Sequence, residues 1–148
     1  FRSINQKTIL LKWDFSKYKG KQIAEAGQLE ITTNSIYRRK DSPKDFGELR
    51  FSEILSAADE WNEETVTYNG FTGNKKFHEV IVSQCIIDSK VNYEKNGKTI
   101  VTISKPVLQR LIDGKSAGIA ILPLGLISAT FYDRNTTDFA PRLRFNIK

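Results

Sequence analysis

The chain contains 148 residues, of which 39% are hydrophobic and 27% are charged, and its formal net charge at pH 7 is +6. This length and composition predict one globular domain spanning residues 1–148 and argue against disorder. No apolar run approaches the roughly 20 residues of a membrane-spanning helix, so we expect no membrane insertion.

Hydrophobic residues that alternate with polar ones predict a succession of short β-strands along the chain. The alternation is clear at the start, where Ile9, Leu11 and Trp13 recur at every second position. In chain order the predicted strands cover residues 9–15, 28–32, 48–51, 65–68, 79–87, 98–103, 117–122, 128–132 and 142–147. Turn residues such as Asn96 and Gly97 separate them. Many short strands with intervening turns predict an all-β, jelly-roll-like antiparallel β-sandwich.

One short helix is predicted between the sixth and seventh of these strands. Ser104 is suited to be its N-cap, because a serine hydroxyl can accept a hydrogen bond from the first turn. Leu108, Leu111 and Ile112 then form one apolar stripe at helical spacing. A second, weaker helical pattern spans residues 51–59. We therefore expect one or two short helices beside the strands.

Five segments, in chain order, form a pattern that resembles a known family. They are residues 10–16 (LLKWDFS), 28–31 (QLEI), 61–69 (WNEETVTYN), 100–123, and the pair 130–134 with 140–145. Together they resemble the DNRLRE or family 96-like carbohydrate-binding modules. Segment 61–69 is similar to the family's Trp-x-Glu-x-Thr-Val-Thr-Trp motif, with Tyr68 in place of the usual tryptophan. Such modules usually have another strand or two before the first motif, whereas little precedes Ile9, which indicates either a trimmed fragment or a divergent member.

The resemblance implies a non-catalytic β-sandwich, secreted or at the cell surface of a bacterium. Its expected function is to bind a polysaccharide and hold it near a catalytic domain of the same chain. Because the chain starts at Phe1 and contains no methionine, we expect it to be excised from a larger secreted protein. The alternative is a structural spacer or docking domain without a ligand of its own. The resemblance does not identify the sugar.

Aromatic residues beside cations predict where a glycan binds. Tyr37, Arg38 and Arg39 fall together in one predicted loop, and Lys75 and Lys76 in another. Arginine forks bind carboxylate or sulfate groups through paired hydrogen bonds, so these clusters favour an acidic polysaccharide. The alternative is that each cluster is a solvated loop. Trp13 and Trp61 are expected to pack in the core instead, because one alternates with apolar residues and the other stands at a turn.

Oxygen-bearing side chains near the C-terminus predict a candidate site for a structural calcium ion. Asp133, Asn135 and Asp138 lie close together, and calcium prefers clustered oxygen ligands. The alternative is an ordinary polar turn. Zinc is not expected, because the chain has one cysteine and one histidine.

Catalysis and nucleic-acid binding are not expected. The only imidazole, His78, is accompanied by no nucleophile motif or phosphate-binding loop. A polysaccharide lyase would need a set such as Tyr132, Arg134 and Lys76, which the sequence does not bring together. Basic loops with aromatic residues occur in single-strand binders, but no nucleic-acid recognition motif is present.

Overall fold

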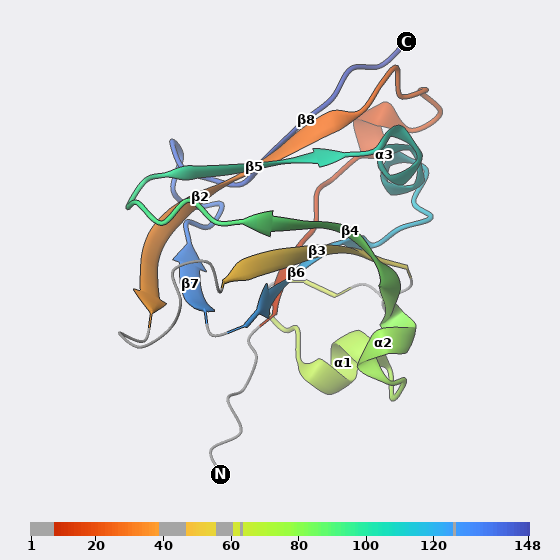
Figure 1. Cartoon of the computed structure of the whole chain (residues 1–148). Coiled ribbons are helices and arrows are strands. Elements are labelled where there is room, and N and C mark those ends of the chain that lie inside the picture. The colour runs from red at the N-terminus through yellow and green to blue at the C-terminus, as the bar shows by residue number, and fades with distance from the viewer. Residues whose placement is uncertain (1–7, 39–46, 56–60, 63, 126) are drawn as a thin grey trace.

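The computed structural model describes residues 8–38, 47–55, 61–62, 64–125 and 127–148. Within them the chain forms eight strands and several short helices (Figure 1). The strands are β1 (Ile9–Leu11), β2 (Gly27–Arg38), β3 (Glu48–Ile54), β4 (Ile81–Lys90), β5 (Lys98–Ile103), β6 (Gly118–Leu124), β7 (Ile127–Phe131) and β8 (Arg142–Arg144). The helices are η1 (Ser16–Tyr18), α1 (Tyr68–Thr72), α2 (Phe77–Val80) and α3 (Lys105–Ile112). None of these helices is long and apolar enough to cross a membrane.

The strands form two antiparallel sheets that pack face to face. The first sheet has the order β1-β6-β3-β4, and the second has the order β5-β2-β7, with β8 also paired to β2. The structure therefore confirms the predicted all-β antiparallel sandwich with short helices. The helix α3 coincides with the predicted helix and begins directly after Ser104.

The main hydrophobic core lies between the two sheets. Leu29 and Ile31 of β2 meet Phe51 of β3 and Ile121 of β6 there, and all four side chains are almost fully buried. The helix α3 closes one end of the sandwich with its apolar stripe, in which Leu108 is fully buried. The periodic residues of the sequence thus become the inward faces of strands and helix.

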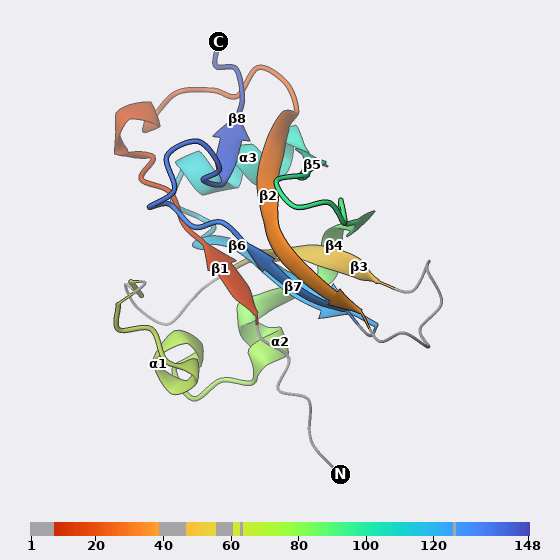
Figure 2. The ribbon, with the colours of Figure 1, turned by 90° about the vertical axis from the view of Figure 1, so that its left-hand side faces the viewer.

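A second, smaller core lies on the other side of the first sheet, beneath α1 and α2 (Figures 1 and 2). Trp61 is buried there and packs edge-on against Phe71, with ring centroids 6.0 Å apart. Val80 of α2 and Ala120 of β6 complete the contact. The molecule is therefore layered, with two short helices, the first sheet and the second sheet in succession, and Trp61 has the core position expected for it.

The strand predicted at residues 65–68 is wrong, because these residues form a turn that leads into α1. The hydroxyl of Thr67 accepts a hydrogen bond from the Gly70 amide at 3.0 Å, which caps the helix. Gly73 ends α1 in the left-handed conformation, with φ of 56°, which glycine adopts without strain. Local capping therefore outweighs the β-propensity of the threonine and valine residues.

The prediction of a helix at residues 51–59 is also wrong for the residues that the structure describes as a strand, because residues 51–54 belong to β3. This strand lies between β4 and β6, and its side chains from Phe51 to Ile54 are buried on both faces. Phe51 and Ile54 are three residues apart, which matches the spacing of a helical stripe, and the polar residues Ser52 and Glu53 between them are buried as well. Residues 56–60 lie outside the described chain.

Several strand boundaries also differ from the prediction. The strand expected from residue 79 begins at Ile81, because α2 occupies the preceding positions. The first strand ends at Leu11 instead of residue 15, and the last ends at Arg144 instead of residue 147. The second strand is much longer than expected and runs to Arg38. Tyr37 and Arg38 therefore belong to a strand and not to the predicted loop.

An ion pair joins α3 to the first sheet. The Arg110 guanidinium donates two hydrogen bonds to the buried carboxylate of Glu53 on β3, at 2.8 and 2.6 Å. The hydrogen bond to Glu53 raises the pKa of Arg110 above its ordinary value, so the guanidinium stays charged.

We expect Arg110→Ala to lower the free energy of unfolding by about 2–4 kcal/mol, because it leaves the Glu53 carboxylate buried without its partner. Urea denaturation measures this change. Lys105→Ala is the matched control, because Lys105 is exposed on the same helix and its loss should change stability by less than about 0.5 kcal/mol. Equal stabilities for the two variants would contradict a structural role for the pair.

Candidate functional site

The central strand of the second sheet is β2, which pairs with three neighbours. Its first half pairs with β5 on one edge and with β8 on the other, and its second half pairs with β7. Leu29 and Ile31 point into the main core. Successive side chains of a strand point to opposite faces, so Gln28, Glu30 and Thr32 point to the side away from the core. We call this side the outer face.

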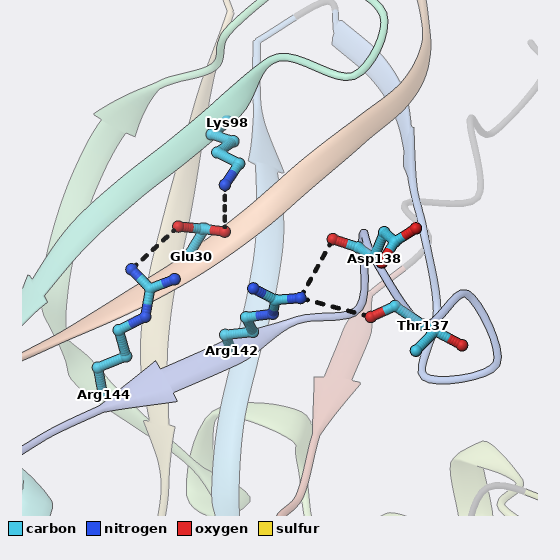
Figure 3. Close-up of polar contacts among 6 residues, drawn as sticks. All are labelled: Glu30, Lys98, Thr137, Asp138, Arg142 and Arg144. Atoms are coloured by element: carbon cyan, nitrogen blue, oxygen red, sulfur yellow. Dashed lines mark hydrogen bonds and ion pairs between the residues drawn. The ribbon is translucent and has the colours of Figure 1, made fainter.

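Glu30 lies near the start of β2 on the outer face, and cations from both neighbouring strands contact it (Figure 3). Its carboxylate lies 3.0 Å from Lys98 Nζ of β5 and 3.4 Å from Arg144 Nη1 of β8. The Glu30 side chain is only 5% exposed, whereas the side chains of Lys98 and Arg144 are 48% and 55% exposed. The carboxylate is therefore covered by cations that face the solvent.

Arg142 adds a third cation to this face. It is paired in register with Glu30, and its Nη2 donates hydrogen bonds to the backbone oxygens of Thr137 and Asp138, at 3.4 and 3.3 Å (Figure 3). Its side chain therefore holds the loop before β8 against the sheet. We call Lys98, Arg142 and Arg144 the cation cluster. Lys98 and Arg144 contact the carboxylate of Glu30, and Arg142 is turned toward the loop before β8.

A β-bulge in β2 extends the outer face toward the far end of the strand. The register with β7 shifts between Thr33 and Ser35, and the additional residue reverses the alternation of side chains. Beyond the shift, Ile36 packs against the main core and Tyr37 is 71% exposed. The Ser35 hydroxyl lies 2.7 Å from that of Thr130 on β7. The bulge thus places Tyr37 on the same side of the sheet as Glu30, with the buried residues Thr32 and Thr33 between them.

The structure places the first predicted cluster at the end of this face. Tyr37 belongs to the outer face, and Arg38 is the last residue of β2, paired with Ile127. Arg39 lies outside the described residues. The seven-residue step from Glu30 to Tyr37 corresponds to roughly 23 Å of strand. The cation cluster lies at the other end and was not identified from the sequence, because its members come from separate strands.

The second predicted cluster lies elsewhere. Lys75 and Lys76 are exposed in the connection between α1 and α2, on the opposite side of the first sheet from the outer face (Figure 1). The backbone amide of Lys76 donates a hydrogen bond to the Glu79 carboxylate at 2.7 Å. The structure therefore does not bring Lys75 and Lys76 together with Tyr37.

The residues considered for a lyase are also separated. Tyr132 stacks on Phe139 with ring centroids 4.8 Å apart, and its hydroxyl donates a hydrogen bond to the Asn96 side chain at 2.8 Å. These contacts hold Tyr132 beside the second sheet, whereas Lys76 lies beyond the first sheet (Figure 1). The imidazole of His78 is exposed on α2.

The candidate calcium ligands form a hydrogen-bonded turn. The Asp133 carboxylate accepts hydrogen bonds from the backbone amide and side chain of Asn135, at 3.0 and 3.3 Å. Asp138 contributes its backbone oxygen to Arg142, as described above. Among the described residues, no group of three or more acidic, histidine or cysteine side chains is placed to hold a metal ion. The polar-turn alternative accounts for these contacts.

A cleft of about 1630 Å³ opens between β1 and β7, the strands at one side of the two sheets. Leu11, Trp13, Phe15 and Phe131 are among its apolar walls, and Trp61 lies at its margin. The sequence pattern did not predict it, because strand periodicity indicates which side chains face inward but not which sheet edge stays open.

Comparisons with protein-family models, with curated proteins and with solved structures found no match to this chain. The resemblance to carbohydrate-binding modules therefore stays a prediction. Functional inference rests on the charges and contacts of the outer face.

Because the Asp133 carboxylate is already occupied by donors of its own turn, we expect a calcium chelator to leave the melting temperature unchanged. Thermal melts with and without chelator measure this. A decrease of several degrees that added calcium reverses would show that Asp133, Asn135 and Asp138 bind a structural ion after all.

Proposed function

We propose that this domain is a non-catalytic module that binds an acidic polysaccharide along the outer face of the second sheet. This proposal rests on the cation cluster, in which two cations contact one buried carboxylate and a third lies on the same strand as Arg144. The module would hold its polymer close to a catalytic domain of the same secreted or cell-surface protein.

The charge balance of the cluster favours an anionic ligand. Glu30 neutralises one of the three cations, so the face keeps an excess of two positive charges. Arg144 uses one of its five N–H donors in a long contact of 3.4 Å to Glu30, and more than half of its side chain is exposed. A ligand carboxylate or sulfate can therefore bind the guanidinium fork without removing Glu30 from Lys98.

The length of the outer face favours a polymer over a small anion. The cation cluster lies near one end and the exposed ring of Tyr37 near the other, with the hydroxyls of Ser35 and Thr130 between them. Ile100, which is paired with Glu30 and 50% exposed, adds an apolar contact beside the cations. Sugar rings present both apolar faces and hydroxyl groups, so an extended glycan suits this mixture.

Binding of this kind acts by proximity. Tethering a polymer beside an enzyme raises its local concentration and leaves the chemistry to the enzyme. Single sites that rest on exposed charges are weak, and we expect dissociation constants on the order of 0.01–1 mM.

A docking domain is the second candidate function, and the open cleft between β1 and β7 favours it. Its apolar walls, which include Trp13, would pack against a neighbouring domain. If the domain has this function, the outer face has no polymer ligand, and the cation cluster only stabilises the sheet.

The decisive variant combines Glu30→Gln, Lys98→Gln and Arg144→Gln, which we call the face variant. It removes two positive charges and one negative charge, so the net charge falls from +6 to +5 without leaving a buried carboxylate unpaired. We expect its retention by alginate, pectin or heparin in affinity electrophoresis to fall at least tenfold, equivalent to about 1.4 kcal/mol.

Lys115→Gln is the matched control for the face variant, because Lys115 is exposed beyond α3 and its loss also gives a net charge of +5. Runs near 0.15 M salt limit long-range charge attraction, which is screened beyond about 8 Å. Equal retention of the two variants would reject the outer face as the binding site. Wild-type protein that no acidic polymer retards would favour the docking function.

A second test addresses Tyr37. We expect Tyr37→Ala to weaken retention by about tenfold, or ~1.4 kcal/mol, because the exposed ring provides a flat apolar surface for a sugar. Tyr37→Phe keeps the ring and should keep the affinity. If Tyr37→Ala binds as tightly as Tyr37→Phe, the ligand does not reach the far end of β2.

A further inference from the structure

An exposed aromatic stack lies on the side of the molecule away from the outer face. The ring of Tyr68, at the start of α1, stacks on Phe77 of α2 with centroids 6.1 Å apart and an interplanar angle of 14°. Phe77 covers one side of the Tyr68 ring, yet the residue remains 63% exposed. A large exposed aromatic ring contributes little to folding, which makes it a candidate binding surface.

The protein holds this stack rigidly from beneath. Phe77 contacts Phe71, whose ring packs against the buried Trp61, so a chain of aromatic contacts leads from the second core to the surface. The caps described above fix both ends of α1, and the bond from Lys76 to Glu79 fixes the start of α2. Rigid aromatic rings bind a ligand with little loss of conformational entropy.

Two cations lie in the connection that leads to Phe77. Lys75 and Lys76 are exposed, and neither forms an ion pair with any residue that the structure describes. The Glu79 carboxylate, the nearest acid in sequence, accepts the Lys76 amide. The surface of Tyr68, Phe77, Lys75 and Lys76, which we call the stack surface, thus combines a flat ring with two lysines and one carboxylate, and its net charge is positive.

We propose that the stack surface is a second binding site for acidic glycan, so that one domain bridges two polysaccharide chains. The inference rests on the proposed function of the outer face. The two surfaces lie on opposite sides of the layered molecule, with both sheets between them (Figures 1 and 2). A short stretch of polymer cannot contact both, so the second site is free to bind another chain.

Bridging has a consequence that a single site does not produce. A domain with two opposed sites joins separate polymer chains into a network, and each chain is held by several domains at once. On dense polymer, a domain that binds through both sites is then retained more strongly than a domain that binds through either site alone.

The test uses a stack variant, which combines Tyr68→Ala, Lys75→Gln and Lys76→Gln, together with the face variant and the combination of both. Light scattering of dilute alginate, polygalacturonate and heparin reports bridging, and affinity electrophoresis in the same polymers reports binding. We expect wild-type protein to increase the scattering. We expect the face variant and the stack variant each to bind about tenfold more weakly and not to increase the scattering. The combined variant should not bind.

Controls separate a lost site from a lost fold. Tyr68→Phe keeps the stacked ring and should bridge like the wild type, and thermal melts should show all variants folded. If the stack variant bridges as well as the wild type, or if the face variant alone abolishes all retention, the second site is rejected while the proposed function stands.

The remaining outcomes bear on the proposed function itself. If the stack variant alone abolishes retention, the stack surface is the only glycan site, which overturns both bridging and the outer face as a binding site. If wild-type protein is not retained by any of the three polymers, both proposals fail together.

Discussion

A buried carboxylate must be compensated, and in this sandwich the cations that compensate Glu30 join three strands of the second sheet. Glu30 lies on the central strand, and its partners Lys98 and Arg144 come from β5 and β8, so one charge joins three strands. Removing the cations alone would leave an unpaired charge under the surface, at a cost of several kcal/mol. The same arrangement keeps cations exposed on the surface of the sheet, which connects the stability of the strand pairing to the proposed function.

The bulge in β2 is the second constraint that shapes the proposed site. Without the extra residue between Thr33 and Ser35, Tyr37 would point toward the core and Ile36 toward solvent. The bulge keeps hydrophobic residues inside along twelve residues of strand while polar and aromatic residues stay outside. The position of Tyr37 on the same side of the sheet as Glu30 is therefore a direct result of one irregularity in the pairing.

Elements set by local sequence were predictable, and those set by tertiary pairing were not. The helix α3 and the strand Lys98–Ile103 agree with their predictions because periodicity and turn residues determine both. The turn at Thr67 was predicted as a strand because β-propensity did not reveal the cap. The cation cluster had no signal in the sequence, since Lys98 and Arg144 are far apart along the chain and meet only because both strands pair with β2. Tyr37 was predicted as a glycan-binding residue from the cations beside it, but its place in a strand was not predicted.

The most direct measurement is a titration of the ¹⁵N-labelled domain with acidic oligosaccharides of alginate, pectin and heparin, followed by amide chemical shifts. We expect shifts that cluster on the outer face, at Glu30, Lys98 and Arg144, and that extend along β2 to Tyr37 with longer oligosaccharides. Shifts confined to the cleft walls, near Trp13 and Phe131, or no shifts at all, would contradict the claim that the outer face binds an acidic glycan.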